Sequence, residues 1–322
     1  MKTGTGITVA VDGRPVAFSN PNKVLWPEDG ITKTDLAAYW LATAPWALPH
    51  LRGRYLVLTR YPDGIHGKSF YQKNLPDHAP PWIRHRPVPS RRSGRTIRYL
   101  LGADAATLVW LAGQAAIEIH PWTSPDTHPD RPDFALVDLD PGEGCGFAEA
   151  VAVAQGLHRL LQELGLRGWV KTSGATGLHV YIPVAPRYTY DQTADFVRRL
   201  GVVLHHLMPG LVTLARPVAE RRGRVYVDYL QNARGKTLVA PYCPRPLPGA
   251  PVSFPVAWRD LPQIHPRQFT IKTVPGLLHK IPPGADPFHS LLTVRQSLDR
   301  ALALLAGLGP ARAKSPGGPP AP

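Results

Sequence analysis

The sequence has little cysteine and no long apolar run, and both absences exclude classes of protein. Two cysteines, Cys145 and Cys243, occur among 322 residues, too few for a disulfide framework or a cysteine-rich zinc site. No stretch reaches membrane-spanning length, and no signal peptide is recognisable. We therefore expect a cytoplasmic protein with no membrane partner.

Acidic residues are scarce relative to basic ones. The chain has 37 Lys and Arg against 23 Asp and Glu, a formal net charge of +14. This excess predicts a polyanionic partner, with nucleic acid as the first candidate; an inert basic surface is the alternative. Hydrophobic content of 43% is ordinary, so we expect a core that supports one large domain or two modest ones.

The few acids that fall inside apolar stretches are therefore informative. Residues 133–142 read Asp-Phe-Ala-Leu-Val-Asp-Leu-Asp-Pro-Gly, which predicts a buried strand ended by a turn. Side chains alternate along a strand, so Asp138 and Asp140 share a face, about 6–7 Å apart. Such a pair can hold divalent ions between its carboxylates. Two solvated acids at a strand end are the alternative, because the motif is short.

A second β-rich run carries a third acid. Residues 224–230 read Arg-Val-Tyr-Val-Asp-Tyr-Leu, and Asp228 in the middle of this strand needs a partner. Together Asp138, Asp140 and Asp228 carry −3, which two Mg²⁺ or Mn²⁺ ions would offset through hard oxygen ligands. Two-metal sites stabilise the attacking and leaving oxygens of a phosphoryl transfer, so the acids favour that chemistry.

Periodicity and turn residues predict how the chain is divided. Residues 1–18 read as a hairpin, 19–307 as the main domain, and 308–322 as a disordered tail rich in Pro, Gly and Ala. Strand–helix–strand order after Asp133 indicates a core built on a mixed sheet. The expected helices are 32–44, 104–116, 147–164, 190–207 and about 287–306.

Several basic and aromatic residues are candidates for binding phosphate or bases. Lys23 and Lys33 lie near the start of the first expected helix, where they would form a phosphate pocket; two solvated lysines are the alternative. Phe70, next to Lys73, suits stacking on a base if exposed, with core packing the equal alternative. Six arginines lie between Trp82 and Tyr99, around a loop tip at 90–94, and would repel one another unless a polyanion lies alongside. They are Arg84, Arg86, Arg91, Arg92, Arg95 and Arg98.

Three motifs taken together resemble the polymerase domain of bacterial ligase D, in the archaeo-eukaryotic primase superfamily. The first is Phe-Ala-Leu-Val-Asp-Leu-Asp-Pro-Gly at 134–142, and the second is Lys-Thr-Ser-Gly-Ala-Thr-Gly-Leu-His-Val-Tyr at 171–181. The third is Val-Asp-Tyr-Leu-Gln-Asn at 227–232. The resemblance covers roughly 19–287. It implies an α+β fold, a primase-like catalytic core with mixed or antiparallel sheets flanked by helices.

The resemblance also implies roles for the residues that match its motifs. Asp138, Asp140 and Asp228 match the metal-binding acids, and His120 matches an active-site histidine. Residues expected to meet the nucleoside triphosphate are Ser173, Gly174, Gly177, His179, Lys236 and Arg245. Residues expected to meet DNA are Lys23 and Lys33 at a 5′-phosphate, Phe70 and Lys73 at the template, and Arg84, Arg86, Arg91, Arg92 and Arg95 in a loop that brings ends together.

The sequence departs from the family pattern in places. Thr176 stands where many relatives have a lysine, which removes one phosphate-binding cation. No lysine precedes Asp12-Gly13-Arg14 as a ligase nucleophile would, so a stand-alone polymerase unit is indicated. Its implied partners are gapped or broken DNA with a 5′-phosphate, the end-binding protein Ku and a separate ATP-dependent DNA ligase, at the nucleoid.

The sequence thus favours a template-directed nucleotidyltransferase, a DNA-dependent RNA or DNA polymerase of bacterial end joining. The resemblance implies a preference for ribonucleotides and two ions, Mn²⁺ or Mg²⁺. Two alternatives stay open. One is a two-metal nuclease that uses the same acids, and the other is a DNA-end-binding module without turnover. The acids and the basic excess do not separate the three.

Overall fold

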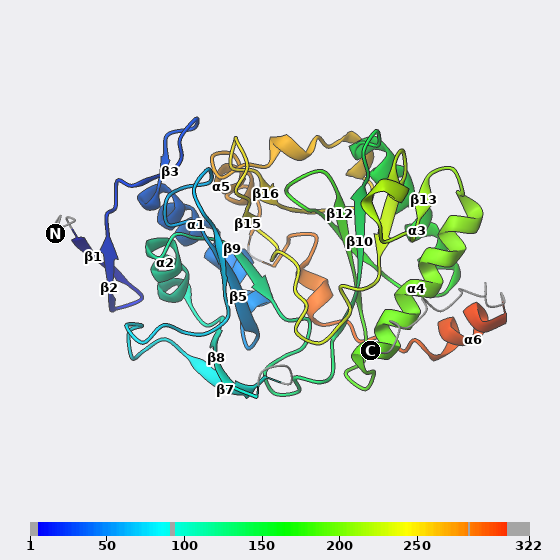
Figure 1. Ribbon diagram of the computed structural model, residues 1–322, viewed down its shortest axis with the longest axis horizontal. Helices are drawn as coiled ribbons and strands as arrows, with labels where there is room; N and C mark the ends of the chain where they lie inside the picture. The colour runs from blue at the N-terminus through cyan, green and yellow to red at the C-terminus, as the bar shows by residue number, and fades with distance from the viewer. Residues whose placement is uncertain (1–5, 91–93, 283, 308–322) are drawn as a thin grey trace, which may run out of the picture.

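Two β-sheets frame the molecule, and each is built from one half of the chain (Figure 1). The computed structural model describes residues 6–90, 94–282 and 284–307. Arg91, Arg92 and the expected tail lie outside these residues. The first sheet contains β5 (Tyr55–Arg60), β6 (Phe70–Gln72), β7 (His85–Pro89), β8 (Thr96–Leu101) and β9 (Ala116–Pro121), in the order β6-β5-β8-β7 with β9 paired to β5.

The second sheet carries the acidic strands. Its order is β13-β14-β10-β12-β11-β17, and within the described residues only β13 and β14 pair in parallel. The strands are β10 (Phe134–Pro141), β11 (Trp169–Thr172), β12 (Leu178–Pro183), β13 (Val212–Thr213), β14 (Val225–Asp228) and β17 (Pro255–Val256). The predicted α+β class with mixed and antiparallel sheets is confirmed.

Helices cover one face of the second sheet, and the acidic side chains of β10 lie on the other face. Helices α3 (Phe147–Glu163) and α4 (Tyr190–Leu207) both pack against β10, as Figure 1 shows on the right. Apolar residues of β10 alternate toward this layer, since Ala135, Val137 and Leu139 belong to the main core. The acids at 138 and 140 therefore project from the opposite face.

The first helix is longer than predicted. Thr32 caps α1 (Lys33–Leu51) in a capping box with Asp35, as expected. The predicted end at residue 44 is wrong, because α1 continues through Pro45 and Pro49. An interior proline costs about 3 kcal/mol. Burial of the last two turns, where Trp46, Leu48 and Leu51 are at most 8% exposed, offsets that cost.

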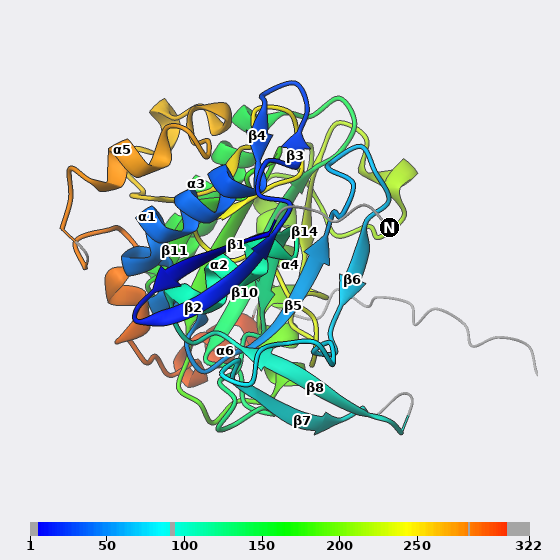
Figure 2. The ribbon, with the colours of Figure 1, turned by 90° about the vertical axis from the view of Figure 1, so that its left-hand side faces the viewer.

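The N-terminal hairpin shares the core of the rest of the molecule. Strands β1 (Gly6–Val11) and β2 (Arg14–Ser19) pair in register around Asp12-Gly13, both at positive φ, as the two-residue turn predicts. Phe18 is 2% exposed and packs on α2 (Ala105–Gly113). Figure 2 shows the hairpin in front of that helix. A separate unit ending at residue 18 remains a prediction.

The C-terminal third wraps around the two sheets in short elements. They are β15 (Cys243–Pro244), β16 (Val252–Ser253), α5 (Val274–Leu278) and α6 (Asp299–Gly307), with short 3-10 turns at 218–221, 261–263, 266–268 and 289–292. The prediction of a continuous helix over 287–306 is wrong. Residues 294–298, just before α6, are in no helix, and here the side-chain amide of Gln296 donates to the carbonyls of Arg167 and Pro183.

One apolar core spans both sheets, and a buried ion pair also joins them. Arg54, next to β5, donates to both carboxylate oxygens of Asp133 at 2.9 and 2.6 Å. Strands β3 (Val24–Trp26) and β4 (Ile31–Thr32) form a further small ribbon at the start of α1. Among the described residues, no helix combines the length and apolar character needed to cross a bilayer.

Candidate active site

Three aspartates lie on one face of the second sheet, on adjacent strands. Asp138 of β10 is in register with Asp228 of β14 on one side and with His179 of β12 on the other. Asp140 is two residues further along β10, opposite Tyr226. Cross-strand partners share a face, so the two sequence runs that carried acids converge as predicted.

Burial and neighbouring negative charge raise the pKa of Asp138 in this cluster. Asp138 is mostly enclosed, whereas the side chain of Asp140 is 52% exposed. Burial, with the negative charges of Asp140 and Asp228, raises the pKa of Asp138 to about 7. Arg221 lies 3.5 Å from Asp140 and offsets part of the charge. The remaining negative charge is one that bound cations would relieve.

Hydrogen bonds from neighbouring residues fix the position of the Asp228 carboxylate. Its two carboxylate oxygens accept hydrogen bonds from the Tyr226 hydroxyl at 3.2 Å, the Leu230 amide at 2.9 Å and the Gln231 side chain at 3.1 Å. Within 6–90, 94–282 and 284–307, no group of three or more His, Cys, Asp or Glu side chains is gathered as a metal site. The donor chemistry nevertheless fits Mg²⁺ or Mn²⁺, which prefer carboxylate oxygens.

A cleft of about 220 Å³ opens beside Asp138 and Asp140. Its wall also includes the loop after β11, His179 and the segment that follows β14. The lining residues are His120, Asp138, Asp140, Ser173, Ala175, Thr176, Gly177, His179, Thr237, Leu238, Val239 and Arg245. Both sheets therefore contribute to the cleft, since His120 belongs to the first and the aspartates to the second.

The loop at 173–177 approaches its neighbours so closely that two glycines are required. A Cβ at Gly177 would lie 2.3 Å from the Leu139 carbonyl oxygen. Gly174 has φ +74°, and a Cβ there would lie 2.7 Å from the Arg245 side chain. The Ser173 hydroxyl accepts from the amides of residues 175 and 177, each at 3.1 Å. Ser173 thus shapes the loop beside the acidic strand.

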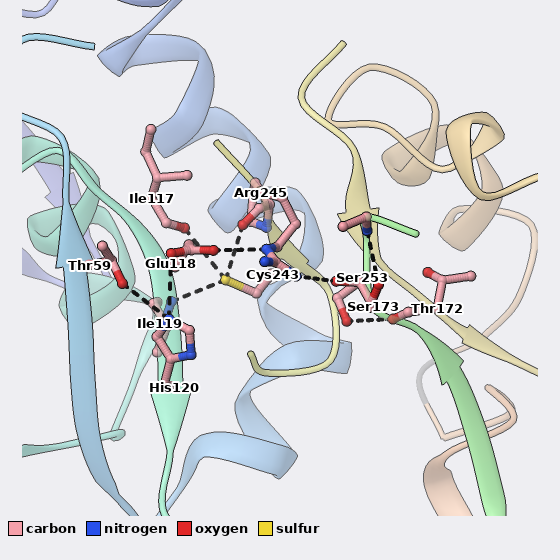
Figure 3. A network of polar contacts seen from close by, with 12 residues as sticks. Thr59, Ile117, Glu118, Ile119, His120, Thr172, Ser173, Cys243, Arg245 and Ser253 are labelled. Carbon is pink, nitrogen blue, oxygen red and sulfur yellow. Dashed lines mark hydrogen bonds and ion pairs between the residues drawn. The ribbon is translucent and has the colours of Figure 1, made fainter. Parts of the chain in front are cut away.

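Arg245 lines the cleft and connects residues of the two halves of the molecule (Figure 3). It donates from Nε to Glu118 Oε1 at 2.8 Å and from Nη1 to the Ser173 carbonyl at 2.5 Å. Burial alone would raise the pKa of Glu118, but the hydrogen bond with His120 and the charge of Arg245 outweigh it and lower the pKa to about 2. His120 Nε2 lies 3.2 Å from Thr59 Oγ1 and 3.6 Å from Glu118 Oε2.

Sequence reasoning assigned no role to Glu118, Arg221 or Lys171. Glu118 holds Arg245, and Arg221 faces Asp140. Lys171 is fully buried, with its Nζ 2.8 Å from Nδ1 of His179. The sequence did carry a signal for Lys171 and Glu118. Each is a charged residue within an apolar strand, in Trp-Val-Lys-Thr and Ile-Glu-Ile-His, and a buried charge needs a partner.

Residues 32–288 match the family model described as LigD, primase-polymerase domain. The chain belongs to the LigD primase-polymerase family. It is accordingly a nucleotidyltransferase of the polymerase and primase class. The predicted family and enzyme class are confirmed.

Relatives of this LigD primase-polymerase chain are longer proteins. The bifunctional non-homologous end joining protein LigD of Bacillus subtilis is 34% identical over 260 residues, which are 80% of this chain and 41% of that protein. The multifunctional non-homologous end joining DNA repair protein LigD of Mycobacterium tuberculosis is 35% identical over 268 residues, 80% of this chain and 35% of that protein. The chain thus spans less than half the length of these curated relatives.

Comparison with a solved structure confirms that this chain has the fold of the LigD polymerase domain. The polymerase domain from Mycobacterium tuberculosis Ligase D, solved in complex with DNA, aligns with a TM-score of 0.79 at 31% identity. The alignment covers 87% of this chain and 99% of that chain.

In this LigD family chain, the two N-terminal lysines converge but differ in exposure. The amide of Lys33 donates to the Lys23 carbonyl. Lys23 pairs with exposed Asp63 at 2.8 Å, whereas Lys33 is 6% exposed and donates to the Ser19 and Gly113 carbonyls. The alternative of two solvated lysines is wrong for Lys33. Burial and nearby positive charges lower its pKa.

The aromatic and arginine candidates lie on the surface of the first sheet. Phe70 and its neighbour Tyr71, on edge strand β6, are 43% and 71% exposed, so the core-packing alternative is wrong; Lys73 is exposed beside them. Arg84, Arg86 and Arg95 are exposed on or beside the hairpin of β7 and β8; residues 91–93 of the predicted tip lie outside the described residues.

The arginines are less isolated from acids than the sequence suggested. Arg86 pairs with Asp126 and Arg98 with Asp77, because the fold brings in acids from distant segments. Arg91 and Arg92 lie outside the described residues. Lys236 is exposed next to Thr237, which lines the cleft.

Proposed function

We propose that this chain is a template-directed nucleotidyltransferase that fills gaps and extends ends during bacterial non-homologous end joining, with a preference for ribonucleotides. The observation that carries the proposal is the register of the acids. Asp138 faces Asp228 across adjacent strands, with Asp140 on the same face. The relatives named as end-joining proteins support the repair role.

Asp138, Asp140 and Asp228 are the residues that would hold two divalent cations, Mn²⁺ or Mg²⁺. The fit rests on their hard oxygen donors and on the burial and charge repulsion that raise the pKa of Asp138. Bound cations would supply Lewis acidity at a primer 3′-hydroxyl and at a triphosphate.

The chain's own residues bind and orient the nucleotide. Arg245 is fixed by Glu118 and the Ser173 carbonyl, interactions that use part of its five N–H donors and leave donors for phosphate oxygens. The loop at 173–177, with Gly174 and Gly177, allows close approach of a phosphate to backbone. Lys236, exposed next to Thr237 of the cleft wall, supplies a positive charge, whereas Thr176 supplies none.

DNA binds over the first sheet and the start of α1. We propose that exposed Phe70 stacks on the template strand while Lys73 meets its backbone. Lys23 and Lys33 form the socket for a 5′-phosphate, and His120 faces the cleft beside the aspartates. Arg84, Arg86, Arg91, Arg92 and Arg95 hold a second DNA end. A structural neighbour solved in complex with DNA supports the binding of DNA.

End joining also requires proteins that hold and seal the break. We propose that the chain works at the nucleoid with the end-binding protein Ku and with an ATP-dependent DNA ligase. The relatives' names, bifunctional and multifunctional, support a polymerase that acts together with other end-joining activities.

A primer-extension assay on gapped 5′-phosphorylated DNA tests the proposal, with ribo- and deoxynucleotides each in Mn²⁺ and in Mg²⁺. The expected result is templated extension that is faster with ribonucleotides. DNA shortening without nucleotide would indicate the nuclease alternative. Binding of ends with no metal-dependent turnover would indicate the binding module. Equal rates with both sugars would contradict the ribonucleotide preference alone.

A further inference from the structure

A lysine is fully buried behind the cleft, where its charge is costly. Lys171 on β11 is 0% exposed, and lysines are almost never fully buried unless paired. Its Nζ contacts His179 Nδ1 at 2.8 Å and the Ser253 hydroxyl. Within the described residues, no hydrogen bond or ion pair joins it to a carboxylate, so charge neutralisation does not explain its presence.

The hydrogen bonds around Lys171 have a defined direction. Ser253 Oγ lies 2.7 Å from the Thr172 carbonyl oxygen, which can only accept, so the serine's single proton is committed there. Ser253 must then accept from Lys171. Burial and the positive charge of Arg245 lower the pKa of Lys171 well below its usual range. In its ammonium form Lys171 carries three donors and no acceptor, so its contact with His179 then also donates. Nδ1 of His179 is thereby an unprotonated acceptor.

The other ring nitrogen of His179 faces the acidic strand. Lys171, His179 and Asp138 lie in register across β11, β12 and β10, and Nε2 of His179 is 3.4 Å from Asp138 Oδ1. Because Nδ1 accepts from Lys171, the proton of the imidazole is on Nε2, and this Nε2–H group presents a donor to an anion.

We propose that Lys171 is a positioning residue that holds His179 in the Nε2–H tautomer, so that the imidazole donates to an anionic oxygen in the cleft. That oxygen belongs to Asp138 here and to a nucleotide phosphate during turnover. The second half rests on the proposed function; the tautomer does not. Without Lys171, His179 is free to place its proton on Nδ1 and turn a lone pair toward the anion.

The tautomer can be measured directly in the free protein. Long-range ¹H–¹⁵N spectra of histidine-labelled wild type, with His179 assigned from the loss of its signals in His179→Asn, are expected to show a protonated Nε2 and an unprotonated Nδ1. A proton on Nδ1 would overturn the proposal. That result is the one expected if a protonated Asp138 donates to Nε2 and a neutral lysine accepts from Nδ1.

The variant Lys171→Met removes the donors but keeps a similar length of chain, and the exposed Lys280→Met is its matched control. In Lys171→Met the Nδ1–H form should become populated, and the KM for the nucleotide should rise roughly tenfold or more, with a smaller change in kcat. An unchanged His179 tautomer would overturn the proposal, whatever the kinetics. If the variant does not fold, the wild-type spectrum decides.

The two proposals fail in different ways. Absence of primer extension by wild type would remove the proposed function but leave the measured tautomer of His179 standing. Normal extension with the proton of His179 on Nδ1 would leave the function and remove the role of Lys171. Lys280→Met should match wild type in both measurements.

Discussion

At the scale of single residues, the cleft is a place where charge is buried in pairs that stability does not require. Glu118 and Arg245 form one such pair, and the buried Lys171 is held by a hydrogen bond to His179. Replacing buried ionic groups by apolar ones is often neutral or stabilising. Their retention here is explained by what they hold in place, namely a guanidinium and an imidazole that face the acidic strand.

The pH dependence of the free energy of unfolding should reveal the stability that the ionised Glu118 carboxylate contributes. Its folded pKa of about 2 lies below its ordinary value of 4.5. The stability it contributes is therefore complete above pH 4.5 and is lost as the pH falls toward 2. Glu118→Gln should cost about 2–3 kcal/mol at pH 7, and the gap to wild type should close between pH 4.5 and 2.5 in urea unfolding.

The exposed Glu163 at the end of α3 offers the matched control. Glu163→Gln should track the wild-type curve across this pH range, because an exposed carboxylate contributes little. A constant deficit of Glu118→Gln at every pH would show that packing rather than ionisation of Glu118 is what the variant loses.

At the scale of elements, the stretch that contains β7 and β8 carries a cluster of arginines in the sequence. Neutralising Arg91, Arg92 and Arg95 to Gln should lower the slope of log affinity against log salt by about 0.9 for each DNA phosphate that an arginine no longer neutralises, up to about 2–3 in total. Filter binding to one duplex across a salt series measures this slope. If the variant and wild type had the same slope, these arginines would not contact the DNA, and the prediction would be contradicted.

The control for the hairpin uses arginines of the other half of the molecule. Arg159, Arg267 and Arg300 are exposed on or beside α3, the 266–268 turn and α6. Replacing these three by Gln removes the same net charge, so a loss of long-range attraction alone would flatten both slopes equally.

The start of α1 carries the second element-scale prediction. Lys23 is partly exposed and pairs with Asp63, so Lys23→Ala should reduce the preference for a 5′-phosphate over a 5′-hydroxyl about tenfold, the loss of one charge-assisted hydrogen bond. Asp63→Asn frees the same lysine and should keep or raise the preference. Paired affinity measurements on the two DNAs test both variants. Equal wild-type affinity for both ends would contradict the socket.

Lys33 is not a clean test of that socket. Its ammonium satisfies two backbone carbonyls, those of Ser19 and Gly113. Lys33→Ala would leave them unpaired in the interior, which costs about 1–3 kcal/mol per group. A loss of phosphate preference in that variant would therefore be mixed with a loss of stability.

Much of the architecture was predictable because local patterns agree with it. The hairpin turn at Asp12-Gly13, the capping box at Thr32 and the strands that carry Asp138 and Asp228 all follow from short-range periodicity and turn chemistry. The predictions that were wrong concern helix boundaries that tertiary contacts decide. The helix persists past Pro45 because its last turns are buried, and the expected final helix is broken where Gln296 pairs with distant backbone.

The candidate site was predictable as a set of acids but not as an arrangement. Alternation placed Asp138 and Asp140 on one face, yet nothing local shows that Asp228 lies opposite Asp138. Lys171 and Glu118 were missed for the same reason, since their partners are distant along the chain. Long-range register, which single-sequence patterns do not encode, decides these contacts.

At the scale of the whole molecule, two sheets from the two halves of the chain meet at the cleft. The segment after β14 runs along β9, where the Ile119 amide donates to the Cys243 thiol and the Ala240 amide donates to the Ile119 carbonyl. Arg245 then spans to the loop beyond β11. The acids belong to one sheet and most of the DNA-binding candidates lie on or beside the other, so the proposed function would bring substrate binding and chemistry together where the sheets are joined.

The central claim is that nucleotide transfer depends on the facing acids, and Asp228→Ala tests it most directly. Single-nucleotide incorporation on gapped 5′-phosphorylated DNA is measured for wild type and variant, with DNA affinity measured alongside. We expect extension by the templated nucleotide in wild type, a loss of more than about a thousandfold in the variant, on the order of removing an essential electrostatic group, and nearly unchanged affinity. Extension by Asp228→Ala within tenfold of wild type would contradict the account.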